Sequence, residues 1–195
     1  MKRLSAIIIG FLVIACSMFG CATPGQGDGW ITLFDGTDLN NWTAIGNANW
    51  RLQDGNVQAE LGSGYLVSKN SYKDFQIRAE FWVDTAANSG IFIRCSDPKK
   101  IGADNSYEVN IFDTRPDPSY GTGGIVNIAK VTTVLKAGGQ WNTYEITAKG
   151  PEFTVTLNGV RTVDGAKDSK FASGPIALQY GAGVVKFRKV QIRPL

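Results

Sequence analysis

Side chains that could hold and cleave a sugar alternate along one short stretch, Tyr107-Glu108-Val109-Asn110-Ile111-Phe112-Asp113. Successive side chains of an extended strand point to opposite faces, so Glu108, Asn110 and Phe112 share one face. The other face is apolar and suited to a core. A carboxylate can act as a general base, an amide binds hydroxyl groups, and an aromatic ring stacks on the apolar face of a sugar. The stretch therefore predicts a carbohydrate site centred on Glu108.

Further polar and aromatic side chains are expected on the same surface as Glu108. If the outward faces of the middle strands form one concave sheet, they supply the ring and the hydroxyl-binding groups that a sugar needs. The expected members are Glu80, Trp82, Phe92, Arg94, Glu108, Asn110 and Gln179. The plainer alternatives are a solvated or salt-bridged Glu108 and an Arg94 that pairs with Glu80 or Glu108 for structural reasons. Asn88 belongs to an Asn-Ser-Gly sequence that is also ordinary turn chemistry.

Short strands alternate with glycine-rich turns from residue 29 onward, and no segment shows sustained helical periodicity. The clearest strand runs from Phe75 to Val83, where apolar and other residues alternate. Trp141 to Lys149 and Glu152 to Leu157 predict a hairpin. Phe187 is out of phase with the apolar residues of the last strand, which predicts a bulge. The pattern predicts an all-β sandwich or jelly roll of two antiparallel sheets.

Composition limits both the architecture and the chemistry. The 195 residues, 43% of them hydrophobic, can bury one substantial core, so residues 29–195 are expected to form a single domain. The net charge of +3 gives no reason to expect nucleic acid as a partner. The absence of histidine from the sequence excludes Ser-His-Asp triads, Cys-His pairs and histidine-ligated zinc. Cys95 is expected on the inward face of its strand, as an inert buried thiol.

The N-terminus has the pattern of an export signal. Basic residues precede an apolar run that is too short to cross a bilayer, so residues 1–21 predict a signal peptide of the lipoprotein type. Cys21 is favoured as the lipidated residue, because residues 22–28 resemble a flexible tether to the domain. Cys16 fits the lipobox pattern better, and an ordinary cleaved signal peptide is the further alternative. We expect a protein of the bacterial cell envelope, in the periplasm or at the outer membrane, held to the membrane only by its N-terminal lipid.

The stretch Glu108 to Asp113 also resembles a weakened Glu-x-Asp-x-x-Glu signature of laminarinase-type glycoside hydrolases. In that signature a bulge places both terminal carboxylates on the sugar side, as nucleophile and acid. Asn110 replaces the central acid, and Asp113 is one carbon shorter than the final glutamate. This weakens the case for a two-carboxylate retaining mechanism.

A series of short motifs runs in order from Trp30 to Leu195. They are Leu33-Phe34-Asp35-Gly36, Leu39, Trp42, Trp50, Asp54-Gly55, Tyr65-Leu66, Asp74-Phe75, Asn88 to Arg94, Tyr107-Glu108-Val109, Thr122-Gly123, Trp141-Asn142, Leu157-Asn158-Gly159, Gly174-Pro175-Ile176, Leu178-Gln179 and Phe187-Arg188. Each motif is weak alone, but together they are highly specific. The chain resembles the 3-keto-disaccharide hydrolase family, which has a concanavalin A-like jelly-roll fold.

The resemblance implies hydrolysis of glycosides whose sugar is oxidised at carbon 3. A ketone there acidifies the proton on carbon 2, so a base can remove this proton and expel the anomeric substituent, and water adds afterwards. On this hypothesis Glu108 is the base and Arg94 stabilises the enolate. Asn88, Asn110 and Gln179 bind hydroxyl groups.

Two positions depart from the family pattern. Asn110 stands where the family usually has glutamine, and no histidine follows Leu178-Gln179, where the family usually has one. The missing histidine favours an alternative function, a non-catalytic carbohydrate-binding module on the same fold. A structural or adhesive lipoprotein is a third hypothesis. No cofactor is expected; the fold is compatible with a calcium ion, but no calcium-loop spacing supports one. The oligomeric state is left open.

Overall fold

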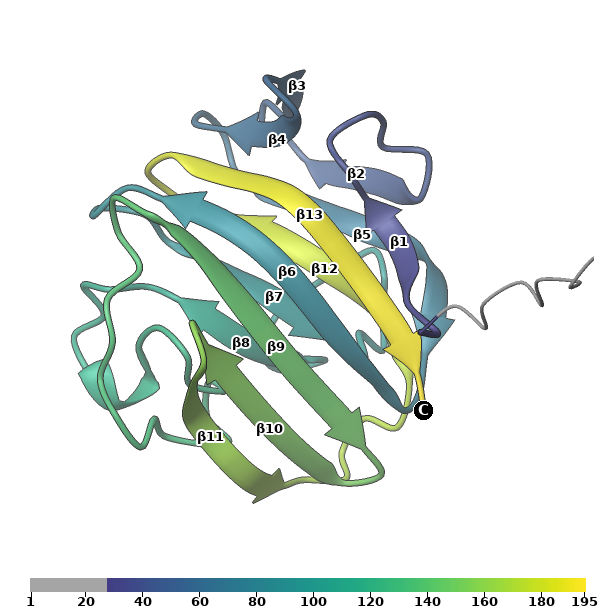
Figure 1. The fold of residues 1–195 in the computed structure, drawn as a ribbon, viewed down its shortest axis with the longest axis vertical. Helices are drawn as coiled ribbons and strands as arrows, with labels where there is room; N and C mark the ends of the chain where they lie inside the picture. The colour runs from purple at the N-terminus through teal and green to yellow at the C-terminus, as the bar shows by residue number, and fades with distance from the viewer. Residues whose placement is uncertain (1–27) are drawn as a thin grey trace, which may run out of the picture.

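The computed structural model describes residues 28–195, which form a sandwich of two antiparallel β-sheets packed face to face (Figure 1). The all-β jelly-roll sandwich predicted from the sequence is confirmed. The expected signal peptide and both candidate lipidation sites, Cys16 and Cys21, lie outside the described residues. Within residues 28–195, no helix is both long enough and apolar enough to cross a membrane.

Each sheet combines strands that are distant in the sequence. In the described part of the chain, the larger sheet (sheet A) has eight strands, seven of them in the order β11-β10-β9-β6-β13-β4-β3, and β1 also pairs with β13. The smaller sheet (sheet B) has five strands in the order β2-β5-β12-β7-β8. The strands are β1 (Ile31–Phe34), β2 (Trp42–Gly46), β3 (Arg51–Gln53), β4 (Asn56–Ala59), β5 (Gly64–Tyr72), β6 (Phe75–Val83), β7 (Ser89–Ile93), β8 (Tyr107–Ile111), β9 (Trp141–Lys149), β10 (Glu152–Leu157), β11 (Val160–Lys167), β12 (Gly174–Tyr180) and β13 (Val185–Pro194). A short 3-10 helix, η1 (Pro118–Tyr120), follows β8.

Alternating apolar residues build the core between the sheets. In β6, every second side chain from Phe75 to Val83 is at most 2% exposed, and the intervening side chains lie on the outer side of sheet A. Burying a large apolar side chain contributes roughly 1.5–3 kcal/mol, so the alternation decides which face turns inward. The β9–β10 hairpin has the predicted bounds. The predicted bulge in β13 is also confirmed, because its register against β6 shifts between Phe187 and Lys189.

The end of β7 departs from the predicted alternation. Arg94 has a φ of 54°, a left-handed backbone conformation that redirects its side chain. The Arg94 guanidinium therefore lies 5.2 Å from the ring of Phe153, which belongs to sheet A. Cys95 packs instead with Phe92 and Val67 on the outer side of sheet B. The predicted inward orientation of Cys95 is wrong, but the thiol is buried, and burial raises its pKa to about 12.

Two segments cover the outer side and the free edge of sheet B. Val67, Phe92, Cys95 and Ala177 form a small apolar cluster there, called the outer cluster. The connection of residues 96–106 supplies Ile101, which packs on this cluster. Residues 112–129 follow the edge of β8, where the Val126 amide donates a hydrogen bond to the carbonyl of Glu108. These two segments frame the surface that carries the Glu108 side chain.

Candidate functional site

Glu108 lies on the outer side of sheet B, paired with Phe92 of the neighbouring strand β7. Its side chain is half-buried, and none of the ion pairs between described residues includes it. Burial raises the pKa of Glu108 to about 7, and the positive charge of Arg115 opposes this shift. A carboxyl group with a pKa near 7 can both take and release a proton at neutral pH, as general acid–base chemistry requires.

A glycine opens space beside this carboxylate. Gly90 of β7 is paired with Asn110 of β8. A Cβ atom at Gly90 would lie 3.4 Å from Glu108 Cγ and 3.5 Å from Gln179 Oε1. These distances place Glu108 and Gln179 on two sides of the glycine, although they belong to β8 and β12. Gly90 therefore forms the base of the space between the side chains of Glu108 and Gln179.

Gln179 and Tyr65 continue the site across sheet B. They are paired residues of β12 and β5, and Gln179 Nε2 lies 3.5 Å from Tyr65 Oη. Both line a cavity of about 310 Å³, which residues 99–101 border from the covering segment, a volume in the range of small-ligand sites. Burial raises the pKa of Tyr65, and the charge of Glu108 adds to this effect, so the Tyr65 hydroxyl stays protonated at neutral pH. Gln179 Oε1 is buried without a hydrogen-bond partner among the described residues, as expected of an acceptor that serves a ligand or water.

Of the two asparagines predicted to bind hydroxyl groups, Asn88 lies next to a residue of the cavity lining and Asn110 is buried. A Cβ atom at Gly181, which lines the cavity, would lie 3.4 Å from Asn88 Cγ. Asn110 is 0% exposed, and its Nδ2 donates a hydrogen bond of 2.7 Å to the carbonyl of Tyr120. Asn110 therefore anchors the segment beside β8, and direct sugar binding does not fit its burial.

Phe92, predicted as a stacking platform, is covered by the protein itself. It is 1% exposed, and its ring meets the ring of Tyr65 edge-on, with centroids 5.4 Å apart. Ile101 packs over the outer cluster to which Phe92 belongs. The prediction of Phe92 as a sugar contact is wrong, because residues 96–106 fold over its face; the ring supports Tyr65 instead.

Arg94 lies outside the Glu108 site. Its Nε donates to the carbonyl of Lys73 and its Nη1 to the carbonyl of Gly150, both at 2.8 Å, and its Nη2 pairs with Asp74 Oδ1 at 3.1 Å. Burial lowers the pKa of Arg94, and the charge of Asp74 opposes that shift. The predicted position of Arg94 beside Glu108 is wrong because its left-handed backbone turns the guanidinium inward. The enolate-stabilising role thereby loses its geometric basis.

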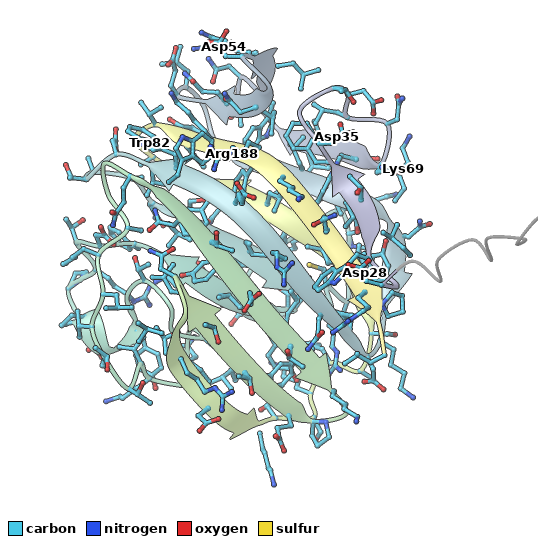
Figure 2. All side chains as sticks on the ribbon, viewed as in Figure 1. Asp28, Asp35, Asp54, Lys69, Trp82 and Arg188 are labelled. Carbon is cyan, nitrogen blue, oxygen red and sulfur yellow. The ribbon has the colours of Figure 1, made fainter. Side chains whose placement is uncertain are left out.

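Glu80 and Trp82 also lie away from Glu108, on the outer face of sheet A. Both belong to β6, where Glu80 Oε2 accepts a hydrogen bond of 2.6 Å from Arg188 Nε. Lys186 Nζ lies 4.9 Å from the ring centroid of Trp82. Figure 2 shows Trp82 and Arg188 at the same end of sheet A. Alternation predicts correctly that Glu80 and Trp82 share a face, but their predicted place beside Glu108 is wrong, because alternation does not reveal which sheet the strand joins.

The second carboxylate of the weakened glycosidase signature has a structural role. Asp113, the second carboxylate of the weakened glycosidase signature, accepts hydrogen bonds from Thr122 Oγ1 and from the amides of Ala137 and Gly138. Asp113 is thus committed to holding loops together. Among residues 28–195, no group of three or more acidic or cysteine side chains is arranged to hold a metal ion.

Two residues of the site, Gly90 and Tyr65, were not predicted as site residues from the sequence. The Asn-Ser-Gly pattern predicts a turn at Gly90, but this residue lies inside strand β7, where a glycine often marks a close approach or a space for a ligand. Tyr65 was recognised only as part of a motif, and its pairing with Gln179 joins residues 114 positions apart. No local pattern reveals such a pairing.

The structure defines a β-sandwich protein whose outer face carries a half-buried carboxylate, two amide side chains, a tyrosine and a small cavity; such sandwiches host both lectins and hydrolases. Residues 29–193 match the model of the 3-keto-alpha-glucoside-1,2-lyase-like domain, and the chain belongs to this family. A relative, the 3-keto-disaccharide hydrolase of Bacteroides thetaiotaomicron, is 26% identical over 164 residues, which cover 68% of this chain and 57% of that protein. The chain thus spans little more than half the length of this relative.

Solved structures share the same sandwich. Two candidate glycosyl hydrolases from Parabacteroides distasonis superpose with TM-scores of 0.76 and 0.70. The first is 20% identical, and the match covers 86% of this chain and 94% of that structure. The second is 27% identical, and the match covers 85% of this chain and 99% of that structure. The carbohydrate-binding module CBM66 from Bacillus subtilis has a TM-score of 0.59 at 19% identity, covering 85% and 95%. The matches at 20% and 19% identity establish the shared fold alone.

Proposed function

We propose that this chain cleaves glycosides whose sugar carries a ketone at carbon 3, with Glu108 as the base. The observation that carries the proposal is the half-buried, unpaired carboxylate of Glu108, which has a pKa of about 7 and faces Gln179 across Gly90. Family membership and the name of the Bacteroides relative support the substrate class. The candidate glycosyl hydrolase from Parabacteroides distasonis that is 27% identical to this chain supports a sugar as the ligand.

The proposed reaction is an elimination followed by an addition. The ketone acidifies carbon 2, so Glu108 takes the carbon-2 proton and the electron pair delocalises onto the ketone oxygen as an enolate. The enolate collapses to a double bond between carbons 1 and 2 as the bond from carbon 1 to the glycosidic oxygen breaks. The proton on Glu108 passes to this leaving oxygen. Water then adds across the double bond and gives the free 3-keto sugar.

Tyr65 and Gln179 take the place that the sequence analysis gave to Arg94. The Tyr65 hydroxyl stays protonated at neutral pH, and Gln179 Nε2 is a second donor beside it. In the proposed complex these two groups donate hydrogen bonds to the enolate oxygen, where negative charge develops. Asn88 and the unpartnered Gln179 Oε1 bind sugar hydroxyl groups.

The alternative function is a carbohydrate-binding module without turnover. The sequence contains no histidine, and the family usually has one soon after the position of Gln179. On this alternative, the same cavity holds a sugar and Glu108 accepts a hydrogen bond from it.

One experiment separates the two functions. The purified chain is incubated in D₂O with a 3-keto disaccharide and, in parallel, with its unoxidised form, while calorimetry measures binding. Cleavage of the oxidised sugar alone, with deuterium incorporated at carbon 2, is expected because the D₂O that adds across the double bond places a deuteron on carbon 2. Cleavage without deuterium at carbon 2 would contradict the elimination, and binding without cleavage would establish the module.

We also propose that the chain is exported and anchored in the bacterial cell envelope by a lipid on Cys21, or on Cys16. The basic residues and short apolar run at the N-terminus support this proposal. Metabolic labelling with palmitate in a bacterial host is expected to mark the wild type and not the Cys21→Ala variant. Label that persists in Cys21→Ala and disappears in Cys16→Ala would move the anchor to Cys16.

A further inference from the structure

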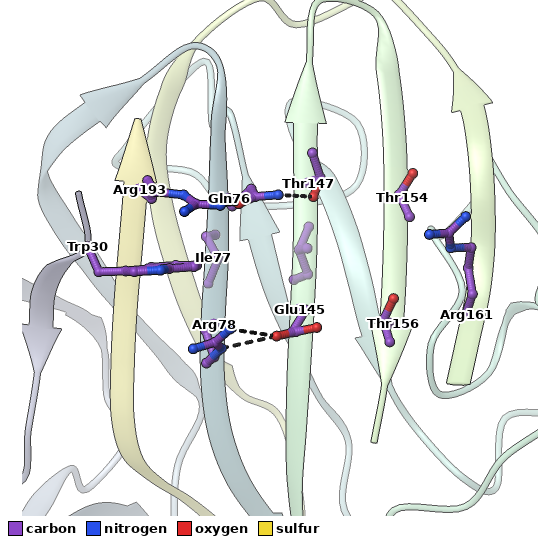
Figure 3. Close-up of a pocket in the computed structure, with 11 residues that line it drawn as sticks. Trp30, Gln76, Ile77, Arg78, Glu145, Thr147, Thr154, Thr156, Arg161 and Arg193 are labelled. Carbon is purple, nitrogen blue, oxygen red and sulfur yellow. Dashed lines mark hydrogen bonds and ion pairs between the residues drawn. The ribbon is translucent and has the colours of Figure 1, made fainter. Parts of the chain in front are cut away.

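A groove of about 320 Å³ crosses the outer face of sheet A, on the opposite side of the sandwich from Glu108 (Figure 3). This sheet A groove runs from β13 across β6, β9 and β10 to β11, and Trp30 forms a wall at the β13 end. Its volume lies at the lower end of the range for ligand sites. The roles assigned to Glu108, Gln179 and Tyr65 do not involve it.

Trp30 holds two arginines in place at one end of the sheet A groove. The guanidinium carbons of Arg78 and Arg193 lie 4.9 Å and 5.0 Å from its ring centroid. Figure 3 shows the ring between the two side chains. Both faces of the ring are therefore occupied, so Trp30 positions cations and does not offer a stacking surface to a neutral sugar.

Arg193 has unused hydrogen-bonding capacity. Its Nη2 contacts the neutral amide oxygen of Gln76, and its Nη1 makes only a long contact of 3.5 Å with the carbonyl of Asp28. Its Nε is buried without a hydrogen-bond partner among the described residues. No ion pair between described residues includes Arg193. Its positive charge is thus available to an anionic group in the groove.

The groove contains an arginine at each end and an ion pair between them. Arg78 donates through Nε and Nη2 to Glu145 Oε1, at 3.1 Å and 2.9 Å, so the opposite charges of these two side chains cancel. Arg161, at the β11 end, pairs with Asp164 through Nη1, but these side chains are 60% and 63% exposed, where ion pairs contribute little. Figure 3 shows the Arg161 guanidinium directed toward the groove floor.

Hydroxyl groups lie between Arg193 and Arg161. Thr147 of β9 and Thr154 and Thr156 of β10 line the floor. The strands that carry Arg193 and Arg161 are four positions apart in the sheet, about 19 Å at the usual spacing of 4.7–4.9 Å. One small anion cannot contact both Arg193 and Arg161. A continuous polyanion would meet the Glu145 carboxylate between them.

We propose that the sheet A groove binds an acidic oligosaccharide. Carboxylate or sulfate groups on separate sugar units form charge-assisted hydrogen bonds with Arg193 and Arg161. Uncharged hydroxyls of the sugar units between them bind Thr147, Thr154 and Thr156. The proposal does not depend on the reaction at Glu108, and it gives the protein a second glycan contact on the opposite face of the domain.

The test is calorimetric titration of the whole chain with oligogalacturonate, a chondroitin sulfate oligosaccharide and a neutral maltooligosaccharide of equal length. Tight binding of one or both acidic probes is expected. Arg161→Gln should weaken it about tenfold, because a charge-assisted hydrogen bond is lost. Thr154→Val should weaken it a few-fold. Lys149→Gln is the matched control, because it removes one exposed positive charge from the same face of β9 outside the groove, and it should change the Kd less than twofold.

Several outcomes would overturn the proposal. These are the absence of binding to both acidic probes at millimolar concentration, equal binding of the neutral probe, and a loss in Lys149→Gln as large as that in Arg161→Gln. Tripolyphosphate or vesicles of anionic phospholipid bound as tightly, with the same dependence on Arg161, would also contradict it. Melting temperatures of all variants confirm that each remains folded, and cleavage of the 3-keto substrate should be unchanged in Arg161→Gln.

Discussion

The outer faces of the two sheets treat charge in opposite ways. On sheet A, acidic side chains are neutralised by arginines, as Glu145 is by Arg78 and Glu80 is by Arg188. On sheet B, Glu108 is half-buried and belongs to none of the ion pairs between described residues. Burial accordingly raises the pKa of Glu108 to about 7. The difference shows that a carboxylate is prepared for proton transfer when it is partly buried and has no ion-pair partner.

The largest expected effect comes from removing the sheet B carboxylate. Glu108→Gln keeps the size of the side chain but cannot take a proton, so cleavage of a 3-keto glycoside should fall roughly 10²–10⁴-fold. Glu80→Gln on sheet A should retain nearly full activity. Initial rates of sugar release measure both. Full turnover in Glu108→Gln together with loss in Glu80→Gln would reverse the assignment of the site.

The next largest effect concerns stability and contrasts a buried arginine with an exposed one. Arg94→Met should lower the free energy of unfolding by about 3 kcal/mol, because carbonyl groups and the carboxylate of Asp74 lose their buried donor. Arg188→Met should cost at most about 1 kcal/mol, since its ion pair is partly exposed. Urea unfolding followed by tryptophan fluorescence measures both. Equal losses of unfolding free energy in the two variants would mean that the Arg94 network stabilises the fold no more than a surface ion pair does.

A smaller effect is expected from filling the floor of the sheet B site. In Gly90→Ala, the new methyl group would lie 3.2 Å from the carbonyl oxygen of Val109 and 3.4 Å from Glu108 Cγ. Gly90 has no positive φ, so the fold should tolerate alanine. We expect kcat/KM to fall about tenfold, equivalent to about 1.4 kcal/mol. Gly102→Ala is the control, because no atom lies within 4 Å of its Cβ position; equal effects would show that Gly90 is not a contact surface.

The mildest test is a change of pH. With a pKa of about 7, Glu108 is about half ionised at pH 7 and about one-tenth ionised at pH 6, so kcat/KM should fall about fivefold. The pKa is raised from 4.5 in the fold, so the folded state binds more protons than the unfolded state between about pH 4.5 and 7. Stability should therefore decline as pH rises through this window. Glu108→Gln should lack that decline, and a slope identical to the wild type would contradict the shift.

The sequence predicts what depends on neighbouring residues. The alternation from Phe75 to Val83 identifies the buried face of β6, and the β9–β10 hairpin follows from the pattern on each side of Gly150 and Pro151. Glu108 was correctly predicted on the outer face of its strand, and its place opposite Gln179 across Gly90 supports its choice as the centre of the site.

What the sequence does not predict depends on sheet membership and on single backbone angles. Glu80 and Trp82 have the right pattern for a shared surface, but β6 joins sheet A and β8 joins sheet B. A single positive φ at Arg94 exchanges the expected faces of Arg94 and Cys95. Asn110 is buried by a segment that returns to β8 from beyond the strand, so its exposure is a tertiary property.

The Arg94 network also bears on how the protein assembles. Its carbonyl partners, on Lys73, Gly150 and Phe171, lie 21, 56 and 77 residues away in the sequence. A guanidinium that leaves water before these carbonyls arrive has nothing to replace its hydration, which disfavours partly closed arrangements of the two sheets. Contacts of such long sequence separation form late and slowly. Arg94 thus links three segments that are distant in the sequence and holds them together at this end of the sandwich.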